Sequence, residues 1–182
     1  MSRAALLARP VLPLLCAALL TACGDDSTGP NRLTPDEVSG NYQICALVFT
    51  PNQNFPPPVD VRLNAIEGTT GLLVLVPQNQ GGQIAYTPKG GGLTQTINAT
   101  YTLGRNQVTL NFGGQASARN ALLLPDPLTL DYDALSRTLQ TVTAPYSVPK
   151  ASYEAVANVQ FTNAIDPITG TLTASFTAGG CP

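Results

Sequence analysis

Apolar and polar residues alternate along most of the chain, in short segments that turn residues separate. In residues 93–103 and 153–162 the apolar side chains fall mostly on every second position. A period of two is typical of a β-strand that buries one face. The pattern predicts about nine to eleven strands, over residues 42–50, 59–65, 71–76, 83–87, 93–103, 108–112, 120–124, 128–132, 139–142, 153–162 and 171–177.

Helix is expected at one place only, just before the first strand. In residues 33–38, Thr34 can cap a helical turn and Pro35 suits its first position. Glu37, three residues after Thr34, completes a capping box. The sequence therefore predicts a single helical turn that leads into the strand region.

The predicted strands follow one another through short turns, most clearly at residues 89–92 and 166–170. Glycine and proline in these segments are strong turn signals. This order favours one all-β domain over residues 33–182, built as an antiparallel up-and-down meander. We expect the meander to close into a β-barrel, because closure leaves no exposed strand edges. A β-sandwich is the alternative.

The first 22 residues have the composition of a secretory signal peptide. Arg3 and Arg9 provide a positive start, and residues 11–20 form an apolar run. This run is shorter than the roughly 20 residues that a membrane-spanning helix needs. The tetrad LTAC at residues 20–23 follows and resembles the lipobox of bacterial lipoproteins. The alternatives are lipidation at Cys16, or an ordinary secreted protein with a chance cysteine.

The lipobox resemblance implies cleavage before Cys23 and attachment of a diacylglyceryl group to its thiol. Residues 23–32 would then be the lipidated N-terminus and a polar, flexible tether. The resemblance thus implies an exported protein whose partner is the membrane that its lipid enters. Gly24, where an aspartate resembles an inner-membrane retention signal, favours the outer membrane of a diderm cell, on its periplasmic side or at the cell surface. The layout as a whole also resembles that of other bacterial lipoproteins.

Two cysteines remain for the domain once Cys16 leaves with the leader and Cys23 is lipidated. These are Cys45, in the first predicted strand, and Cys181, after the last one. Two thiols in an exported protein usually pair, so we expect a Cys45–Cys181 disulfide. First and last strands are neighbours in a closed barrel, and the predicted bond agrees with that fold.

The composition removes several classes of function. The chain has no histidine, which excludes Ser-His-Asp triads, Cys-His dyads and histidine metal sites. Beyond the leader it carries seven basic and eleven acidic residues, a net charge of −4, and no basic patch for nucleic acid. Asp131 and Asp133 would share one face of a strand, yet a solvated turn is a better interpretation than acid–base or calcium chemistry. No enzymatic activity, cofactor or metal is expected.

The opening of the first strand carries a second resemblance. The segment VSGNY at residues 38–42 is similar to the opening of lipocalins, in which a glycine precedes an aromatic residue by two positions. Tyr42 stands where lipocalins usually have tryptophan, and the long C-terminal lipocalin helix has no counterpart. The resemblance implies a lipocalin-like barrel that can hold a small apolar molecule.

The candidate lining of such a barrel is taken from inward positions of the alternating strands. Core packing is the alternative interpretation for every one of these residues. They are Ile97, Tyr101, Leu110, Phe112, Val159 and Phe161.

Two functions follow from the sequence. The first is a membrane-anchored envelope lipoprotein that binds a small lipophilic ligand in its barrel. The alternative is a non-enzymatic structural or protein-interaction module of the envelope, with unknown protein partners. The apolar run at 71–76 and the proline-rich loop at 51–58 are candidate contact patches, although a buried strand and a stiff connection are the better interpretations.

Overall fold

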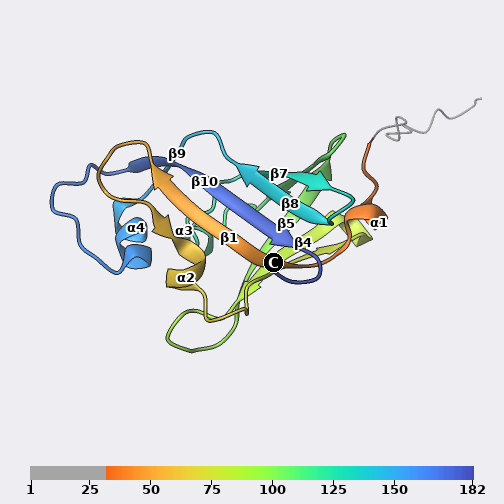
Figure 1. Ribbon diagram of the computed structural model, residues 1–182, viewed down its shortest axis with the longest axis horizontal. Helices are drawn as coiled ribbons and strands as arrows, with labels where there is room; N and C mark the ends of the chain where they lie inside the picture. The colour runs from red at the N-terminus through yellow and green to blue at the C-terminus, as the bar shows by residue number, and fades with distance from the viewer. Residues whose placement is uncertain (1–31) are drawn as a thin grey trace, which may run out of the picture.

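Eight antiparallel strands pair in a closed ring, which confirms the predicted all-β, lipocalin-like barrel architecture (Figure 1). The computed structural model describes residues 32–182, so the predicted leader 1–22, Cys23 and the tether up to residue 31 lie outside the described residues. The strands of the ring, in spatial order, are β1 (Gly40–Pro51), β3 (Leu72–Val76), β4 (Gly81–Tyr86), β5 (Gln95–Leu103), β6 (Gln107–Asn111), β7 (Leu128–Asp133), β8 (Thr138–Val142) and β10 (Ile168–Thr177).

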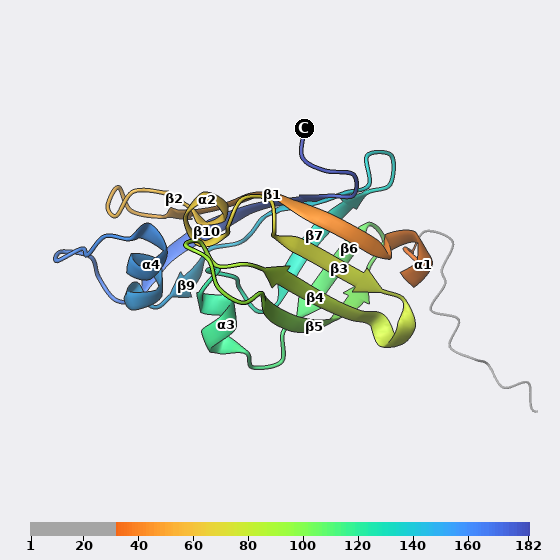
Figure 2. The same cartoon turned by 90° about the horizontal axis from the view of Figure 1, so that it is seen from below.

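The two longest strands, β1 and β10, continue beyond the barrel and form a second part of the domain. There β2 (Val59–Asp60) pairs with β1, and β9 (Tyr146–Val148) pairs with β10. Two helices, α2 (Val61–Ala65) and α4 (Lys150–Ala157), pack beside this extension. We call it the lobe; it lies at the opposite end of the molecule from the first helix in both views (Figures 1 and 2).

A β-bulge at Cys45 lets one strand serve both parts. Ile44 pairs with Phe176 and Ala46 with Ser175, so Cys45 is an extra residue without an opposite partner. The inward positions therefore shift from Tyr42 and Ile44 to Leu47 and Phe49. Such a bulge bends a strand and increases its twist, which suits a strand that leaves the barrel for the lobe.

Short helices occupy the ends of the barrel. The predicted turn is α1 (Pro35–Val38), and the backbone N–H and hydroxyl of Thr34 both donate to the carboxylate of Glu37, at 2.6 and 2.8 Å. At the other end lies α3 (Ala116–Asn120), and the 3₁₀ turn η1 (Gln78–Gln80) connects β3 to β4. None of the helices in residues 32–182 has the length and apolar character of a membrane span.

Three predicted strands are wrong over all or part of their length. Residues 59–65 form only the short β2 before α2, whose first turn is capped by the Asp60 carboxylate accepting from Leu63 N. Residues 120–124 continue from α3 as turns, and residues 153–162 hold most of α4 and a loop. Tyr153, Val156 and Ala157 are spaced three and four residues apart, which fits one face of a helix as well as the alternation fits a strand.

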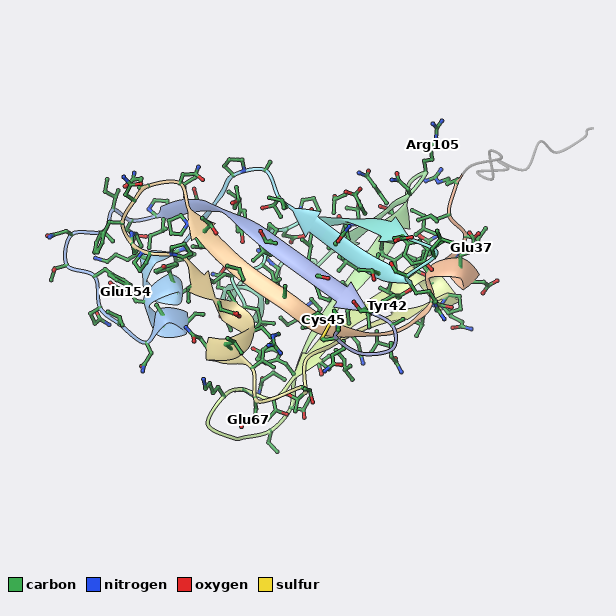
Figure 3. All side chains as sticks on the ribbon, viewed as in Figure 1. Glu37, Tyr42, Cys45, Glu67, Arg105 and Glu154 are labelled. Atoms are coloured by element: carbon green, nitrogen blue, oxygen red, sulfur yellow. A yellow bond between two sulfur atoms is a disulfide. The ribbon has the colours of Figure 1, made fainter. Side chains whose placement is uncertain are left out.

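The predicted disulfide between Cys45 and Cys181 is present. It joins the bulge of β1 to the segment after β10 and spans 136 residues of sequence (Figure 3). The bond thus connects the two strands whose pairing closes the barrel, from the side of the bulge. It constrains the unfolded chain far more than a short loop would.

Loss of this disulfide should destabilise the domain strongly. We expect the Cys45→Ser, Cys181→Ser double variant to lose about 2–5 kcal/mol of unfolding free energy, since a loop of this length removes much chain entropy from the unfolded state. Urea unfolding with and without a reductant measures the effect. The reductant should shift the midpoint of the native chain and leave the double variant unchanged; a reductant-insensitive native chain would contradict the prediction.

Gly170 in β10 is a point where only hydrogen fits. A Cβ there would overlap the carbonyl oxygen of Thr50 and lie 2.6 Å from Cζ of Phe49. We expect Gly170→Ala to cost about 1–3 kcal/mol of unfolding free energy through overpacking. Gly104→Ala is the control, because its nearest neighbour, Cβ of Gln107, lies at 3.4 Å. Equal thermal midpoints for the two variants would show that β10 can move away from β1.

Candidate functional site

Four of the six candidate lining residues lie in the barrel core. Ile97 and Tyr101 come from β5, Leu110 comes from β6, and Phe112 follows directly after β6. All four are almost completely buried. Tyr101 is paired with Leu110 across the two strands, and its hydroxyl donates to the carbonyl of Val76 at 3.1 Å. The alternation therefore predicted the inward face of these strands correctly.

The other two candidates do not line the barrel. Val159 is 51% exposed in the loop after α4, so its placement on an inward strand face is wrong. Phe161 is buried, but in the lobe, where its ring meets Tyr153 at 5.8 Å and Phe55 at 5.4 Å. Both errors follow from the strand predicted over residues 153–162.

Large side chains fill the barrel. Aromatic and branched residues from strands all round the ring are at most 2% exposed. Three hollows have linings made of described residues, and none of them includes any of the six candidates. The fully buried large side chains of the barrel strands include Tyr42, Leu47, Leu73, Leu75, Ile84, Ile97, Tyr101, Leu110 and Phe176.

The α1 turn closes one end of the barrel through a cluster of polar contacts with buried aromatic residues. Tyr42 donates its hydroxyl to the carbonyl of Val38 at 2.7 Å, and Tyr132 donates to that of Glu37 at 2.9 Å. Arg137, from the turn between β7 and β8, donates to the carbonyl of Ser39 at 3.0 Å. Burial raises the pKa of Tyr42 to about 12, with a further contribution from nearby Tyr132 and an opposing one from the Arg137 charge.

The glycine of the VSGNY segment has a role in this cluster. Gly40 has a φ of +147°, and a Cβ there would lie 3.2 Å from the Arg137 guanidinium. A glycine two positions before Tyr42 thus lets the arginine approach the start of β1. Gly40 therefore has a local packing role in this chain.

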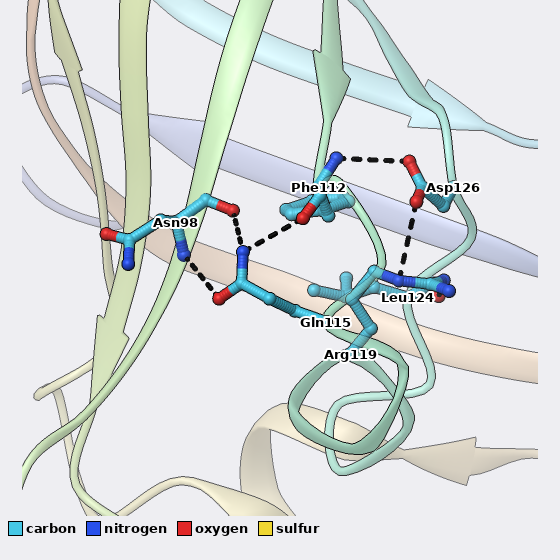
Figure 4. Close-up of polar contacts among 6 residues, drawn as sticks. All are labelled: Asn98, Phe112, Gln115, Arg119, Leu124 and Asp126. Atoms are coloured by element: carbon cyan, nitrogen blue, oxygen red, sulfur yellow. Dashed lines mark hydrogen bonds and ion pairs between the residues drawn. The ribbon is translucent and has the colours of Figure 1, made fainter.

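The α3 segment closes the other end of the barrel (Figure 4). Gln115 bridges two strand regions: its side chain accepts from Asn98 N and donates to the carbonyls of Asn98 and Phe112. Arg119 donates from Nη1 to the carbonyl of Leu124 at 3.0 Å. These bonds hold a run of fully buried leucines, 122–124, against the core.

The largest of the three described hollows lies outside the barrel wall. It has a volume of about 510 Å³ and opens to solvent over β7 and the end of β8. That volume is within the range of small-ligand sites. Its lining is about equally polar and apolar: the polar members are Gln107, Asp126, Thr129, Asp131, Thr141 and Thr143, and the others are Pro125, Pro127, Val142, Ala144, Pro145 and Tyr146.

This hollow exists because β7 and β8 separate. Their pairing runs from Asp133–Thr138 to Asp131–Gln140 and stops there. Beyond that point β8 stays with β10, as the bond from Thr143 N to the carbonyl of Leu172 shows. Thr129 in β7 and Val142 in β8 would be the next residues to face each other with their backbone groups. Neither of them has a partner strand on that side.

The carboxylates near the hollow differ in their partners. Asp126 accepts from Phe112 N at 3.1 Å, and its second oxygen lies 3.7 Å from Nε of Arg119 (Figure 4). Asp131 accepts from the amide of Gln107 at 3.0 Å and remains exposed. No lysine or arginine is among the lining residues, so the exposed charge of the hollow is negative.

Asp133 is the last residue of β7 and borders the turn that follows, close to the turn expected from the sequence. Its carboxylate accepts from the hydroxyl of Ser136 and from Leu135 N, and these bonds lower its pKa. Within residues 32–182, no three acidic or cysteine side chains gather in a way that could hold a metal ion. The pair Asp131 and Asp133 therefore serves separate local contacts.

The tip of the lobe is the second exposed feature. A hollow of about 180 Å³ lies between the proline-rich loop after β1 and the loop before β10. Phe55 and Ile165 border it and are 47% and 66% exposed. Loop 51–58, one of the two candidate contact patches, thus presents an aromatic ring at its tip. The other, β3, buries Leu73 and Leu75 and turns its remaining residues outward.

Comparison with known protein families, with curated protein sequences and with solved structures finds no match for this chain. Its function is therefore inferred from its own residues and geometry.

Stability at alkaline pH should report the burial of Tyr42. A phenol whose pKa is about 12 in the folded protein and about 10 when unfolded stabilises the fold fully below pH 10 and loses that contribution as the pH rises towards 12. We expect Tyr42→Phe to cost about 1 kcal/mol at pH 7, through the lost bond to Val38. The difference between variant and native chain should then shrink above about pH 10, by up to ~1.4 kcal/mol per pH unit. Urea unfolding from pH 8 to about pH 11 tests this; parallel pH profiles would contradict it.

Proposed function

We propose that this chain is an exported lipoprotein, anchored to the membrane at Cys23, whose barrel is a non-enzymatic protein-interaction module. The lipobox-like tetrad at residues 20–23 supports the anchor. The Cys45–Cys181 disulfide supports an oxidising compartment outside the cytoplasm, where such bonds persist. On this proposal the domain is held at a membrane surface and offers its outer face to partners.

The observation that carries the interaction role is the filled interior. Ile97, Tyr101, Leu110 and Phe112, the candidates for contact with an apolar ligand, pack together in the core. An eight-stranded barrel is just wide enough either to be filled by side chains or to hold one small ligand. Packing of this kind favours the first use, and it moves recognition to the outer wall and the lobe tip.

Mass spectrometry of the intact protein tests the interaction role against ligand carriage. The protein is purified gently from its own host and measured under native conditions. We expect the mass of the lipidated chain with one disulfide and no further component. An added apolar mass that disappears on denaturation would make the barrel a ligand carrier and overturn the proposed role.

Metabolic labelling with a radioactive fatty acid tests the anchor separately. We expect Cys23→Ser to abolish incorporation of the label and to release the domain from the membrane fraction. Cys16→Ser is the matched control and should retain both properties, because Cys16 is removed with the leader. If only the Cys16 variant lost the label, the lipid would be attached to Cys16, which would contradict the proposed anchor at Cys23.

A further inference from the structure

The separation of β7 from β8 leaves two strand edges that face each other across the hollow of about 510 Å³. Successive residues of a strand direct their backbone N–H and C=O groups alternately to the two neighbouring strands. Tyr132 N donates to the carbonyl of Asn106, next to β6. Thr129 lies three residues earlier, so its backbone groups point the other way, towards β8. Thr143 N donates to β10, so those of Val142 point towards β7. Backbone donors and acceptors on an open edge are a template for an added strand.

The segment after Val142 is also open on the side that faces β7. After Val142 the chain continues through Ala144 and Pro145 into β9, which again pairs with β10. β8 and β9 thus form one interrupted edge along β10, and from Thr141 onward the β7 side of this edge has no partner strand in residues 32–182. The hollow of about 510 Å³ beside it has room for a short extended segment.

We propose that the hollow between β7 and β8 receives an extended peptide segment of a partner protein, which adds to the β8–β9 edge as a strand. This inference rests on the proposed interaction role and names the partner's chemistry. Main-chain bonds to Val142 supply the affinity, and side chains of alternate residues meet the lining of the hollow. Exposed Asp131, with no cation among the lining residues, favours a peptide that carries a lysine or arginine.

The lining mixes polar and apolar groups, which suits an extended peptide whose side chains alternate in character. Tyr146 is the one aromatic residue of the lining. Its hydroxyl is engaged by the carbonyl of Leu123, and its ring packs edge-on against Phe49 at 5.5 Å. Its hydroxyl is therefore not free to bind a ligand. The threonines and Asp131 offer polar contacts, and Val142, Ala144 and the prolines offer apolar ones.

The test uses linear decapeptides displayed on phage and selected against the full protein, purified from its host in mild detergent. We expect enrichment of peptides with β-branched residues at alternate positions and at least one basic residue. Hydrogen exchange with a synthetic copy of the enriched peptide should slow at residues 127–131 and 141–146. Absence of enrichment, or protection elsewhere in the domain, would overturn the proposal.

Two variants with a matched control identify the edge. Val142→Pro removes the outward N–H at a position where an edge tolerates proline, and it should weaken peptide binding at least about tenfold. Val142→Thr keeps the N–H and should bind within about twofold of the native chain. Asp131→Lys should reverse the preference for basic peptides. Unchanged thermal midpoints verify that the variants fold.

Equal peptide affinity in the Val142→Pro variant and the native chain would overturn strand addition at this edge. Binding of soluble polysaccharide in the hollow, with competition against the peptide, would also overturn it in favour of a glycan site. These failures are distinct from failure of the proposed function. An apolar ligand in the native mass spectrum removes the interaction role itself, whereas a negative peptide result removes only this edge as its site.

Discussion

The pairing of β1 with β10 is the interaction on which both parts of the molecule depend. It runs from Gln43–Thr177 in the barrel to Pro51–Gly170 in the lobe. Without it the barrel would be an open sheet, and β2 and β9 would lose the common platform that holds them. Gly170 allows the two backbones to approach closely, and the disulfide at the bulge secures the same pair of strands. The same β1–β10 ladder therefore closes the barrel at one end and forms the base of the lobe at the other.

Alternation predicted the strands wherever one face is buried over a sufficient length, as in β5 and β6. It failed for α4, because Tyr153, Val156 and Ala157 also fit helical spacing and only the tertiary partners decide between the two periods. Local signals existed that alternation ignored. Asp60 is a helix-capping residue type, and Pro149 immediately precedes α4. Contacts with β1 and between the two helices then fixed α2 and α4 in the lobe.

The site was harder to predict than the fold. The sequence indicated which residues of β5 and β6 face inward, yet it could not tell a filled barrel from a hollow one, since apolar side chains line both. It also gave no sign that β8 leaves β7 after Gln140, because strand separation depends on the competing partner β10. The prolines at 125, 127 and 145 flank the gap between β7 and β8. Because proline interrupts strand pairing, they are the one feature of the sequence that agrees with this gap. Phe161 reached the lobe through contacts with Tyr153 and Phe55 that no local pattern encodes.

Closure by the first and last barrel strands also sets an order of events in time. A chain made from its N-terminus presents β1 long before β10 exists, and β3 can occupy only one of its edges. Loop-closure entropy makes so distant a pairing slow, and the strands between them can assemble first. The unfinished sheet thus exposes an adhesive edge until its final strand arrives. The barrel can therefore close only after the whole domain has been synthesised.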